Sequence, residues 1–301
     1  MSNLPFGARA TASDVLVDVD LRGRRAVVTG GAAGLGLETS RALLAAGAEV
    51  TAAVRRPRDV GLPGLAQLPL DLADLGSVRR FVDAWAGPLD VLVANAGVMA
   101  VPTRALSAEG WELHLATNYL GHFALASGLH RSLVAAQGAR LVVVSSGAHR
   151  SAPVDLDDLH FDHRTYDPWA AYGQSKSADI LLAVAAGVRW ADDGILANAL
   201  NPGYIHTGLQ RHVDDDTMRV MGAMDEAGDL LEPDYFKTPE QGASTTALLA
   251  GSPHVRSLTG RYFEDNQPAN VVVDGDHGVA PHAVDPATAH RLWEIAEEVI
   301  G

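Results

Sequence analysis

Seven short apolar runs that alternate with stretches of helical periodicity constrain this chain more than any other feature of its sequence. The runs lack a strict alternation of apolar and polar residues, which indicates strands buried on both faces of a parallel sheet. The predicted strands span residues 25–29, 49–54, 65–70, 89–94, 139–145, 196–200 and 260–263. The predicted helices span residues 35–46, 74–86, 108–137, 169–191 and 239–250. This βαβ rhythm predicts an α/β fold built on a doubly wound parallel sheet.

No break in composition divides the 301 residues. With 47% apolar and 20% charged residues, the chain has enough apolar material for a sizeable core. Neither a linker rich in Pro, Gly or Ser nor an internal repeat is present in the sequence. We therefore predict a single domain over residues 1–301, with a leader at residues 1–22 and a C-terminal extension at residues 264–301.

Two long polar segments interrupt the rhythm, at residues 151–167 and 207–238. Each follows a predicted strand, on the edge where doubly wound sheets bind ligands. We predict that both face the substrate and that the second forms a lid. The alternative is that they are ordinary surface loops.

The chain is acidic and has no cysteine. A formal net charge of -14 and a pI near 5.2 leave no basic face for nucleic acid or for an anionic membrane. Without cysteine, the chain forms neither disulfides nor thiolate metal sites. No apolar run approaches membrane-spanning length, and the first 20 residues lack the apolar centre of a signal peptide. We expect a cytoplasmic protein that holds no metal and binds neither nucleic acid nor membranes.

A glycine-rich turn follows the first predicted strand and opens the first helix. Gly30 permits a tight turn, Gly34 lets a backbone approach phosphates, and Gly36 lets the helix pack closely on the sheet. A helix N-terminus in this setting binds the pyrophosphate of a dinucleotide. The spacing is one residue longer in its first gap than G-x-G-x-x-G, so an ordinary turn is the alternative.

Polar residues close the third and fourth predicted strands. Asn95 can tie neighbouring strand ends together, while Gly97 leaves room for a ribose or an adenine. Asp71 ends the third strand, where its carboxylate can accept from an adenine amino group. A strand-ending turn or a helix N-cap explains these residues equally well when each is taken alone.

The end of the second predicted strand bears on which nicotinamide cofactor is bound. Arg55 and Arg56 stand roughly twenty positions after the glycines, where an acidic residue would favour NAD. The planar guanidinium of Arg55 can form hydrogen bonds with a 2′-phosphate, which favours NADP(H). NAD is the alternative if both arginines are simply solvated.

Tyr172 and Lys176 stand one helical turn apart, so both side chains can serve one reacting group. A free tyrosine titrates near pH 10, but a neighbouring ammonium and a positive nicotinamide ring favour its phenolate. Tyr172 can then exchange a proton with a substrate oxygen as hydride moves to or from the cofactor. A solvated surface pair is the alternative reading of this motif.

Three further elements can complete such a site. Ser146 ends the fifth predicted strand, where its hydroxyl can donate to a carbonyl oxygen. Asn118 falls inside a predicted helix, where its amide can hold a water that relays protons from Lys176. The turn at residues 202–207 exposes the backbone of Ile205 and the hydroxyl of Thr207, which can bind a carboxamide. Each has a purely structural alternative.

These motifs, in this order, resemble the short-chain dehydrogenase/reductase family over residues 24–263. The resemblance implies a Rossmann fold, a triad of Ser146, Tyr172 and Lys176 with Asn118 as a fourth member, and a ribose-binding role for Lys176. Ser146 is preferred over Ser145 because the family's serine is usually the second of such a pair. The predicted cofactor site comprises Gly30, Gly34, Leu35, Gly36, Arg55, Asp71, Leu72, Asn95, Ala96, Gly97, Tyr172, Lys176, Pro202, Gly203, Ile205 and Thr207.

Residues 117–123 and 166–172 further resemble the retinol-dehydrogenase-like and WW-domain-oxidoreductase-like branch, which mostly acts on lipophilic aldehydes, ketones and alcohols. Two positions depart from the pattern: Ala94 replaces an asparagine common in the family, and Asp179 stands where this branch commonly has asparagine. Family members often form homodimers or homotetramers through two long helices, here residues 108–137 and 169–191, although the branch includes monomers.

The function favoured by these residues is NADP(H)-dependent oxidoreduction of a carbonyl or alcohol on a small lipophilic or aromatic molecule. Two alternatives share parts of the pattern. A non-catalytic NADP-binding regulator would keep the fold, although the four catalytic side chains argue against it. An epimerase or dehydratase of the extended relatives resembles a Gly-x-x-Gly-x-x-Gly spacing and usually adds a larger second domain, and neither feature is present in this sequence.

Overall fold

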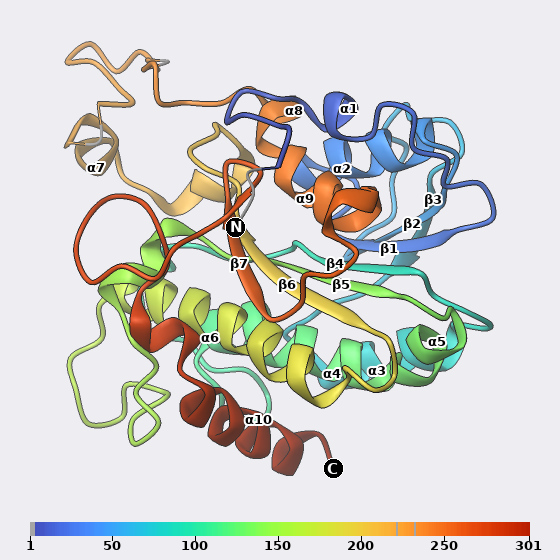
Figure 1. Ribbon diagram of the computed structural model, residues 1–301. Helices are drawn as coiled ribbons and strands as arrows, with labels where there is room; N and C mark the ends of the chain where they lie inside the picture. The colour runs from blue at the N-terminus through green and yellow to red at the C-terminus, as the bar shows by residue number, and fades with distance from the viewer. Residues whose placement is uncertain (1–3, 221, 232) are drawn as a thin grey trace.

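The computed structural model describes residues 4–220, 222–231 and 233–301. In this part of the chain, eight strands form one sheet in the order β3-β2-β1-β4-β5-β6-β7-β8 (Figure 1). Strands β1 to β7 run parallel, and β8 is antiparallel to β7. The strands are β1 (Arg25–Thr29), β2 (Glu49–Val54), β3 (Ala66–Pro69), β4 (Val91–Ala94), β5 (Arg140–Val144), β6 (Leu196–Asn201), β7 (Arg261–Glu264) and β8 (Gln267–Pro268). The parallel sheet predicted from the apolar runs is confirmed.

Helices cover both faces of the sheet (Figure 1). On one face lie α1 (Ala12–Val15), α2 (Gly34–Ala45), α8 (Pro239–Gly242) and α9 (Ser244–Gly251). On the other lie α3 (Leu75–Ala84), the π-helix η1 (Leu115–Leu120), α4 (Gly121–Gly128), α5 (His130–Ala135), α6 (Pro168–Arg189) and α10 (Pro286–Ile300). Short 3-10 helices are η2 (Gly147–Ser151), η3 (Gly208–His212), η4 (Pro253–Val255) and η5 (Pro281–Val284). Among the described residues, every helix is too short or too polar to span a bilayer.

Burial on both sides explains why the strands lack an alternating pattern. Along β1, Val27 contributes to the core beneath α3, α4 and α6, whereas Val28 contributes to the core beneath α2 and α9. Leu92 and Val93 of β4 divide between the two cores in the same way. Because successive strand residues point to opposite faces, both positions must be apolar.

The predicted single helix over residues 108–137 is wrong. Its first part is a loop in which Leu106 forms a β-bridge with Glu112 and Gly110 has a φ of +83°. Helical structure begins only at Leu113 and is interrupted at Leu129, between α4 and α5. Just before this interruption, Gly128 packs so closely on α3 that an added Cβ would lie 2.7 Å from Val82.

The C-terminal extension ends in a 15-residue helix, α10, which the sequence prediction left unassigned. Its start has clear signals, because the Asp285 side chain accepts from the amide of Thr288 and Pro286 occupies the first turn. Trp293 packs edge-on against Phe123 of α4 and Trp190 beyond α6, with centroid separations of 4.8 and 5.3 Å. Helix α10 therefore covers part of α4 and α6, the helices predicted to form oligomers; pairing through them stays a prediction.

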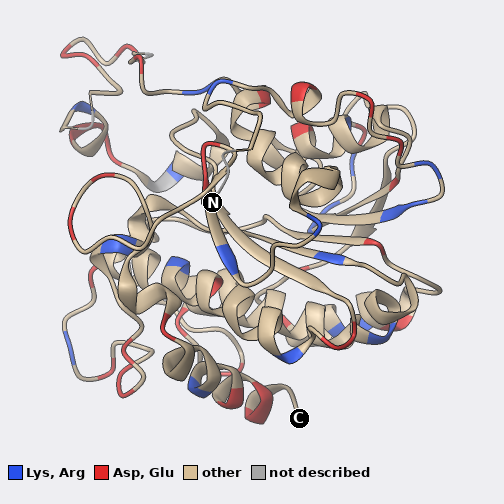
Figure 2. Ribbon diagram, in the orientation of Figure 1, with Lys and Arg blue, Asp and Glu red and all other residues tan. Residues whose placement is uncertain are grey.

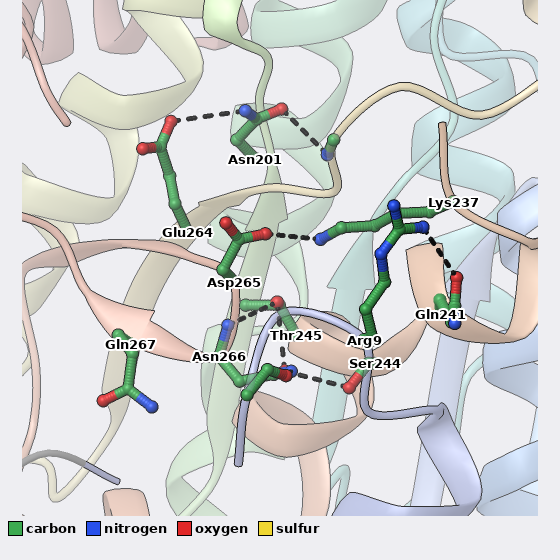
Figure 3. Close-up of polar contacts among 12 residues, drawn as sticks. Arg9, Asn201, Lys237, Gln241, Ser244, Thr245, Glu264, Asp265, Asn266 and Gln267 are labelled. Carbon is green, nitrogen blue, oxygen red and sulfur yellow. Dashed lines mark hydrogen bonds and ion pairs between the residues drawn. The ribbon is translucent and has the colours of Figure 1, made fainter. Parts of the chain in front are cut away.

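Specific contacts anchor the N-terminal leader, and Figure 3 shows one of them, from Arg9 to Gln241 of α8. Gln267 exchanges hydrogen bonds with the backbone of Leu4, and Asn266 donates to the carbonyl of Gly7 at 2.9 Å. Arg9 donates to the carbonyls of Asp234 and Phe236, at the end of the predicted lid. The leader thus joins the β7–β8 turn to the lid, which its irregular sequence did not predict.

The predicted lid follows β6 and contains η3 and α7 (Asp215–Val220). It projects from the body of the protein, and acidic residues are spread along it (Figures 1 and 2). Lys237 at its end forms an ion pair of 2.6 Å with Asp265 in the β7–β8 turn. Residues 1–3 of the leader and residues 221 and 232 of the lid lie outside the described residues.

We predict that Trp293→Ala lowers the free energy of unfolding by about 3 kcal/mol, because it removes a large buried side chain from between α4 and α6. Urea denaturation followed by circular dichroism measures this change. Glu298→Ala, at an exposed position of the same helix, is the matched control and should change stability by less than about 0.5 kcal/mol. Equal effects of the two substitutions would contradict the packing role of Trp293.

Candidate active site

The hydroxyl of Thr29 joins the carboxyl ends of β1 and β4. It accepts hydrogen bonds from the amides of Asn95 and Ala96, each at 2.9 Å. The Asn95 side chain donates in turn to the Thr29 carbonyl at 2.8 Å, and Gly30 donates to the carbonyl of Ala53 on β2. Three neighbouring strand ends are therefore held together where the strand order reverses, which is where doubly wound sheets bind ligands.

The predicted glycine-rich turn lies at this edge. Gly36 has no room for a side chain, since an added Cβ would collide with the Gly30 carbonyl and lie 2.6 Å from the Asn95 amide nitrogen. At the N-terminus of α2, Ala33 makes no side-chain capping hydrogen bond. The first amides of this 12-residue helix are thus left for an anionic group, such as a pyrophosphate.

Residues from the turn after β6 meet the glycine-rich turn. A Cβ added at Gly34 would lie 3.6 Å from Thr207, and one added at Gly242 would contact both Ile205 and Leu35. Gln210 already bonds the Ile205 carbonyl at 2.7 Å and the Thr207 amide at 2.8 Å. Binding of a carboxamide by Ile205 and Thr207 stays a prediction, and it would have to compete with Gln210.

Pro202 and Gly203 begin that turn at the end of β6. Gly203 has a φ of +93°, a conformation that favours glycine, and an added Cβ would lie 3.2 Å from the Lys237 side chain. The turn after β6 is therefore held against the end of the lid.

The remaining predicted cofactor residues lie at the same edge of the sheet. Arg55 is exposed directly after β2. The Asp71 carboxylate accepts from the Ala73 amide at 3.0 Å, and Leu72 packs against Gly121 at the start of α4. Asp71 thus stabilises its own turn, and within the described part of the chain its other carboxylate oxygen is left for a ligand.

Tyr172 and Lys176 lie on α6, where both are buried. The Lys176 ammonium lies 5.9 Å from the centroid of the Tyr172 ring and 3.8 Å from the position of a Cβ added at Gly97. It donates to the Val144 carbonyl at 3.0 Å and to the Asp179 carboxylate at 2.7 Å. Burial lowers the pKa of Lys176, but the charges of Asp179 and Tyr172 outweigh this effect and raise the pKa overall.

Asn118 lies in the π-helix η1, where the sequence predicted an ordinary helix. Its side-chain amide donates to the Val98 carbonyl at 3.1 Å and to the Ser175 hydroxyl at 2.9 Å, and it accepts from the Val98 amide. Both N–H groups of this amide are therefore used within the protein. A water held by the side chain would have to bind its carbonyl oxygen.

The two serines after β5 have different surroundings. The Ser145 hydroxyl is buried and donates to the Lys176 carbonyl at 2.7 Å, which ties β5 to α6. The Ser146 hydroxyl is only partly buried and accepts from the Ala148 amide at 3.2 Å. His149 holds the Ser146 backbone by donating from Nδ1 to its carbonyl at 2.7 Å. Ser146 is therefore the serine whose hydroxyl can still donate to a ligand.

His122 is absent from the residues predicted from the sequence, yet it links the strand edge to η1. Its Nδ1 lies 2.6 Å from the Asn118 carbonyl and its Nε2 lies 2.8 Å from the Thr29 hydroxyl. A carbonyl only accepts, so we place the proton on Nδ1, and Nε2 then accepts from Thr29. Burial lowers the pKa of His122 to about 4, which keeps the ring neutral near pH 7. The sequence shows only a histidine inside a helix, so nothing in it marks this role.

Apolar side chains surround the Tyr172 ring. Met99 and Ala100, from the loop after β4, pack with it in one cluster. Leu209 and Val213 of the lid pack against the same cluster. Trp169 lies edge-on to Tyr172 at 6.2 Å and is about one-third exposed.

We predict that His122→Gln makes stability less dependent on pH. The folded pKa of His122 is lowered, so unfolded chains bind more protons between about pH 6.5 and 4, and stability is lost as the pH falls. Between pH 7 and pH 5, this single group should lower the free energy of unfolding of the wild type by about 2 kcal/mol. The variant should not show this loss. Urea denaturation at both pH values measures it. His277→Gln, at an exposed position, should behave as the wild type; identical slopes for all three proteins would refute the neutral buried ring.

Comparisons with known proteins agree with this geometry. The family model described as short chain dehydrogenase matches residues 24–218. A "Probable oxidoreductase" of Streptomyces lividans is 60% identical over 94% of this chain and 99% of its own length. The polyprenol dehydrogenase of Mus musculus is 38% identical over 90% of this chain and 82% of its own length.

A solved structure, the Pseudomonas aeruginosa RhlG/NADP active-site complex, is 26% identical and covers 82% of this chain and 96% of its own, with a TM-score of 0.61. These similarities extend over most of the chain. They agree with the sheet order and with the site at the edge of the sheet. The chain belongs to the short-chain dehydrogenase/reductase family, with a Rossmann-like fold, and is an oxidoreductase of a family that uses NAD(P).

Proposed function

We propose that this protein interconverts a carbonyl and an alcohol on a small lipophilic or aromatic substrate, with NADP(H) as the redox partner. The observation that carries this proposal is the buried Lys176 ammonium, which lies 5.9 Å from the Tyr172 ring and beside Gly97. The ammonium is therefore near both the phenol that would transfer the proton and the edge of the predicted cofactor site. A surface pair, the alternative reading of Tyr172 and Lys176, is inconsistent with their burial.

In this proposal Tyr172 is the general acid and base. The Lys176 ammonium favours the phenolate, so the phenol can give a proton to a carbonyl oxygen or take one from an alcohol. The Ser146 hydroxyl donates a hydrogen bond to the same oxygen and holds it in place. When bound, the nicotinamide supplies or accepts the hydride. Asn118 holds Val98 and Ser175 in position around the phenol and the ammonium.

The residues present fit a dinucleotide. The uncapped first turn of α2 and the side-chain-free surface at Gly36 suit a pyrophosphate. Arg55 is exposed at the carboxyl end of β2, next to the strand that carries the glycine-rich turn, and favours the 2′-phosphate of NADP(H). The NADP complex of a structural relative supports this choice.

The surroundings of Tyr172 favour a lipophilic substrate. Met99, Leu209 and Val213 present apolar groups beside the phenol ring, and methionine adapts its shape readily to a ligand. Since Leu209 and Val213 belong to the segment at residues 207–238, we propose that this segment closes over the substrate. The name of the polyprenol dehydrogenase relative describes a lipophilic alcohol and supports the same class.

We predict that Tyr172→Phe lowers turnover of carbonyl substrates by at least about a thousandfold, because it deletes the proton donor. NADPH consumption, followed by absorbance with a panel of aldehydes and ketones, measures this loss. NADPH affinity should stay within about twofold of the wild type in a fluorescence titration. Unchanged turnover would refute the role of Tyr172, and a wild type that binds NADPH without any turnover would favour a regulatory protein.

We also predict that the protein binds NADPH more tightly than NADH and that Arg55→Ala weakens NADPH binding by about tenfold or more, because a charge-assisted bond to phosphate is lost. NADH binding should hardly change, since it has no 2′-phosphate. Arg131→Ala, at an exposed position of α5, removes the same charge and is the matched control. Equal or tighter binding of NADH by the wild type would overturn the assignment.

A further inference from the structure

Asp179 lies one turn after Lys176 on α6 and holds its ammonium. The Asp179 Oδ2 atom is 2.7 Å from the Lys176 Nζ atom, and both side chains are almost completely buried, at 1% and 4% exposure. The Val144 carbonyl accepts a second hydrogen bond from the ammonium at 3.0 Å. An ammonium has three donors, so one is left for a ligand.

The other carboxylate oxygen makes Asp179 unusual. Oδ1 is buried and has no hydrogen-bond partner among the described residues. Leaving a buried carboxylate oxygen without a partner is costly, and holding an ammonium does not by itself require a charged acceptor. An amide of the same shape would accept the same hydrogen bond. The negative charge therefore calls for a reason other than holding Lys176.

We propose that Asp179 is a positioning residue with two effects: it holds the Lys176 ammonium, and its negative charge offsets part of the ammonium's effect on Tyr172. The charge of Asp179 thereby sets the pH range in which the phenol exchanges its proton. This proposal rests on the function proposed above. It assigns no contact between Asp179 and the substrate or the cofactor.

Titratable side chains near this cluster include Tyr119 of η1, His122 of α4 and Tyr262 of β7. The His114 ring, which lies 6.1 Å from that of Tyr172 and bonds the Glu112 carboxylate, is also near it. Burial raises the pKa values of both Tyr119 and Tyr262 well above 10 and lowers that of His122 to about 4. These three groups therefore stay neutral near pH 7.

The charge of Asp179 itself depends on pH. Burial raises its pKa, although the Lys176 ammonium acts in the opposite direction. The carboxylate is therefore charged most fully toward alkaline pH, where it opposes the effect of the ammonium on the phenol. The influence of Asp179 should therefore be largest on the alkaline side.

Two substitutions separate the two effects. Asp179→Asn keeps an oxygen that accepts from Lys176 but removes the charge, whereas Asp179→Leu removes both. For carbonyl reduction, the rate falls at alkaline pH as the phenol loses its proton. We expect Asp179→Asn to move this fall to lower pH by about one unit, with NADPH affinity within about twofold of the wild type. Asp179→Leu should weaken NADPH binding by about tenfold, because Lys176 loses its anchor.

The matched control is Asp192→Asn, which makes the same charge change at an exposed position beyond the far end of α6. Its pH profile should coincide with that of the wild type. Thermal melting of all three variants shows whether each one is folded. A profile for Asp179→Asn that coincides with the wild type, in a folded protein, would overturn the charge effect; unchanged NADPH binding by Asp179→Leu would overturn the anchoring effect.

A second readout does not depend on turnover. The ultraviolet absorbance of the Tyr172 phenolate can be followed against pH as the difference between a protein and its Tyr172→Phe counterpart. Its midpoint should move to lower pH when Asp179 is replaced by asparagine. If no carbonyl is reduced but this midpoint moves, the proposed function fails while the role of Asp179 stands; if turnover is present and the midpoint does not move, the role of Asp179 fails alone.

Discussion

The parallel direction of β1 to β7 is the constraint on which the rest of this structure depends, because it places the carboxyl ends of all seven strands at one edge. Residues as far apart in sequence as Thr29, Asn95 and Thr207 meet there only for this reason. The same direction forces each connection to cross a face of the sheet, so helices bury both faces and leave the loops at the edge free to differ.

A continuous set of hydrogen bonds makes that edge rigid. The Thr29 hydroxyl accepts from two strand-end amides and bonds His122, which bonds the Asn118 carbonyl. The Asn118 side chain then bonds Ser175, one residue before Lys176. Each donor and acceptor along this path has a partner, which is what makes a buried polar network stabilising. The glycine-rich turn and the Tyr172–Lys176 pair are therefore fixed relative to each other through protein atoms alone.

Much of this arrangement could be predicted from local patterns. The bounds of β1 and β2 were predicted correctly, because an apolar run bounded by polar residues is a strong local signal. The helix predicted over residues 108–137 was wrong, because its first part pairs Leu106 with Glu112 in a loop and Gly128 ends α4 against Val82. Val82 is far from Gly128 in the sequence, whereas Leu106 and Glu112 are only six residues apart. Helix α10 was missed although Asp285 and Pro286 carry ordinary start signals.

The order of the motifs along the chain determined the fold class, the family and the set of residues at the strand ends, because βαβ periodicity and glycine spacing are properties of neighbouring residues. Only the tertiary structure showed what surrounds those residues. It buried the Ser145 hydroxyl against the Lys176 carbonyl, brought in His122, and showed that Asp179 and Val144 share the Lys176 ammonium. Burial and hydrogen-bond partners come from segments far apart in sequence, and a residue's surroundings exist only once those segments have packed.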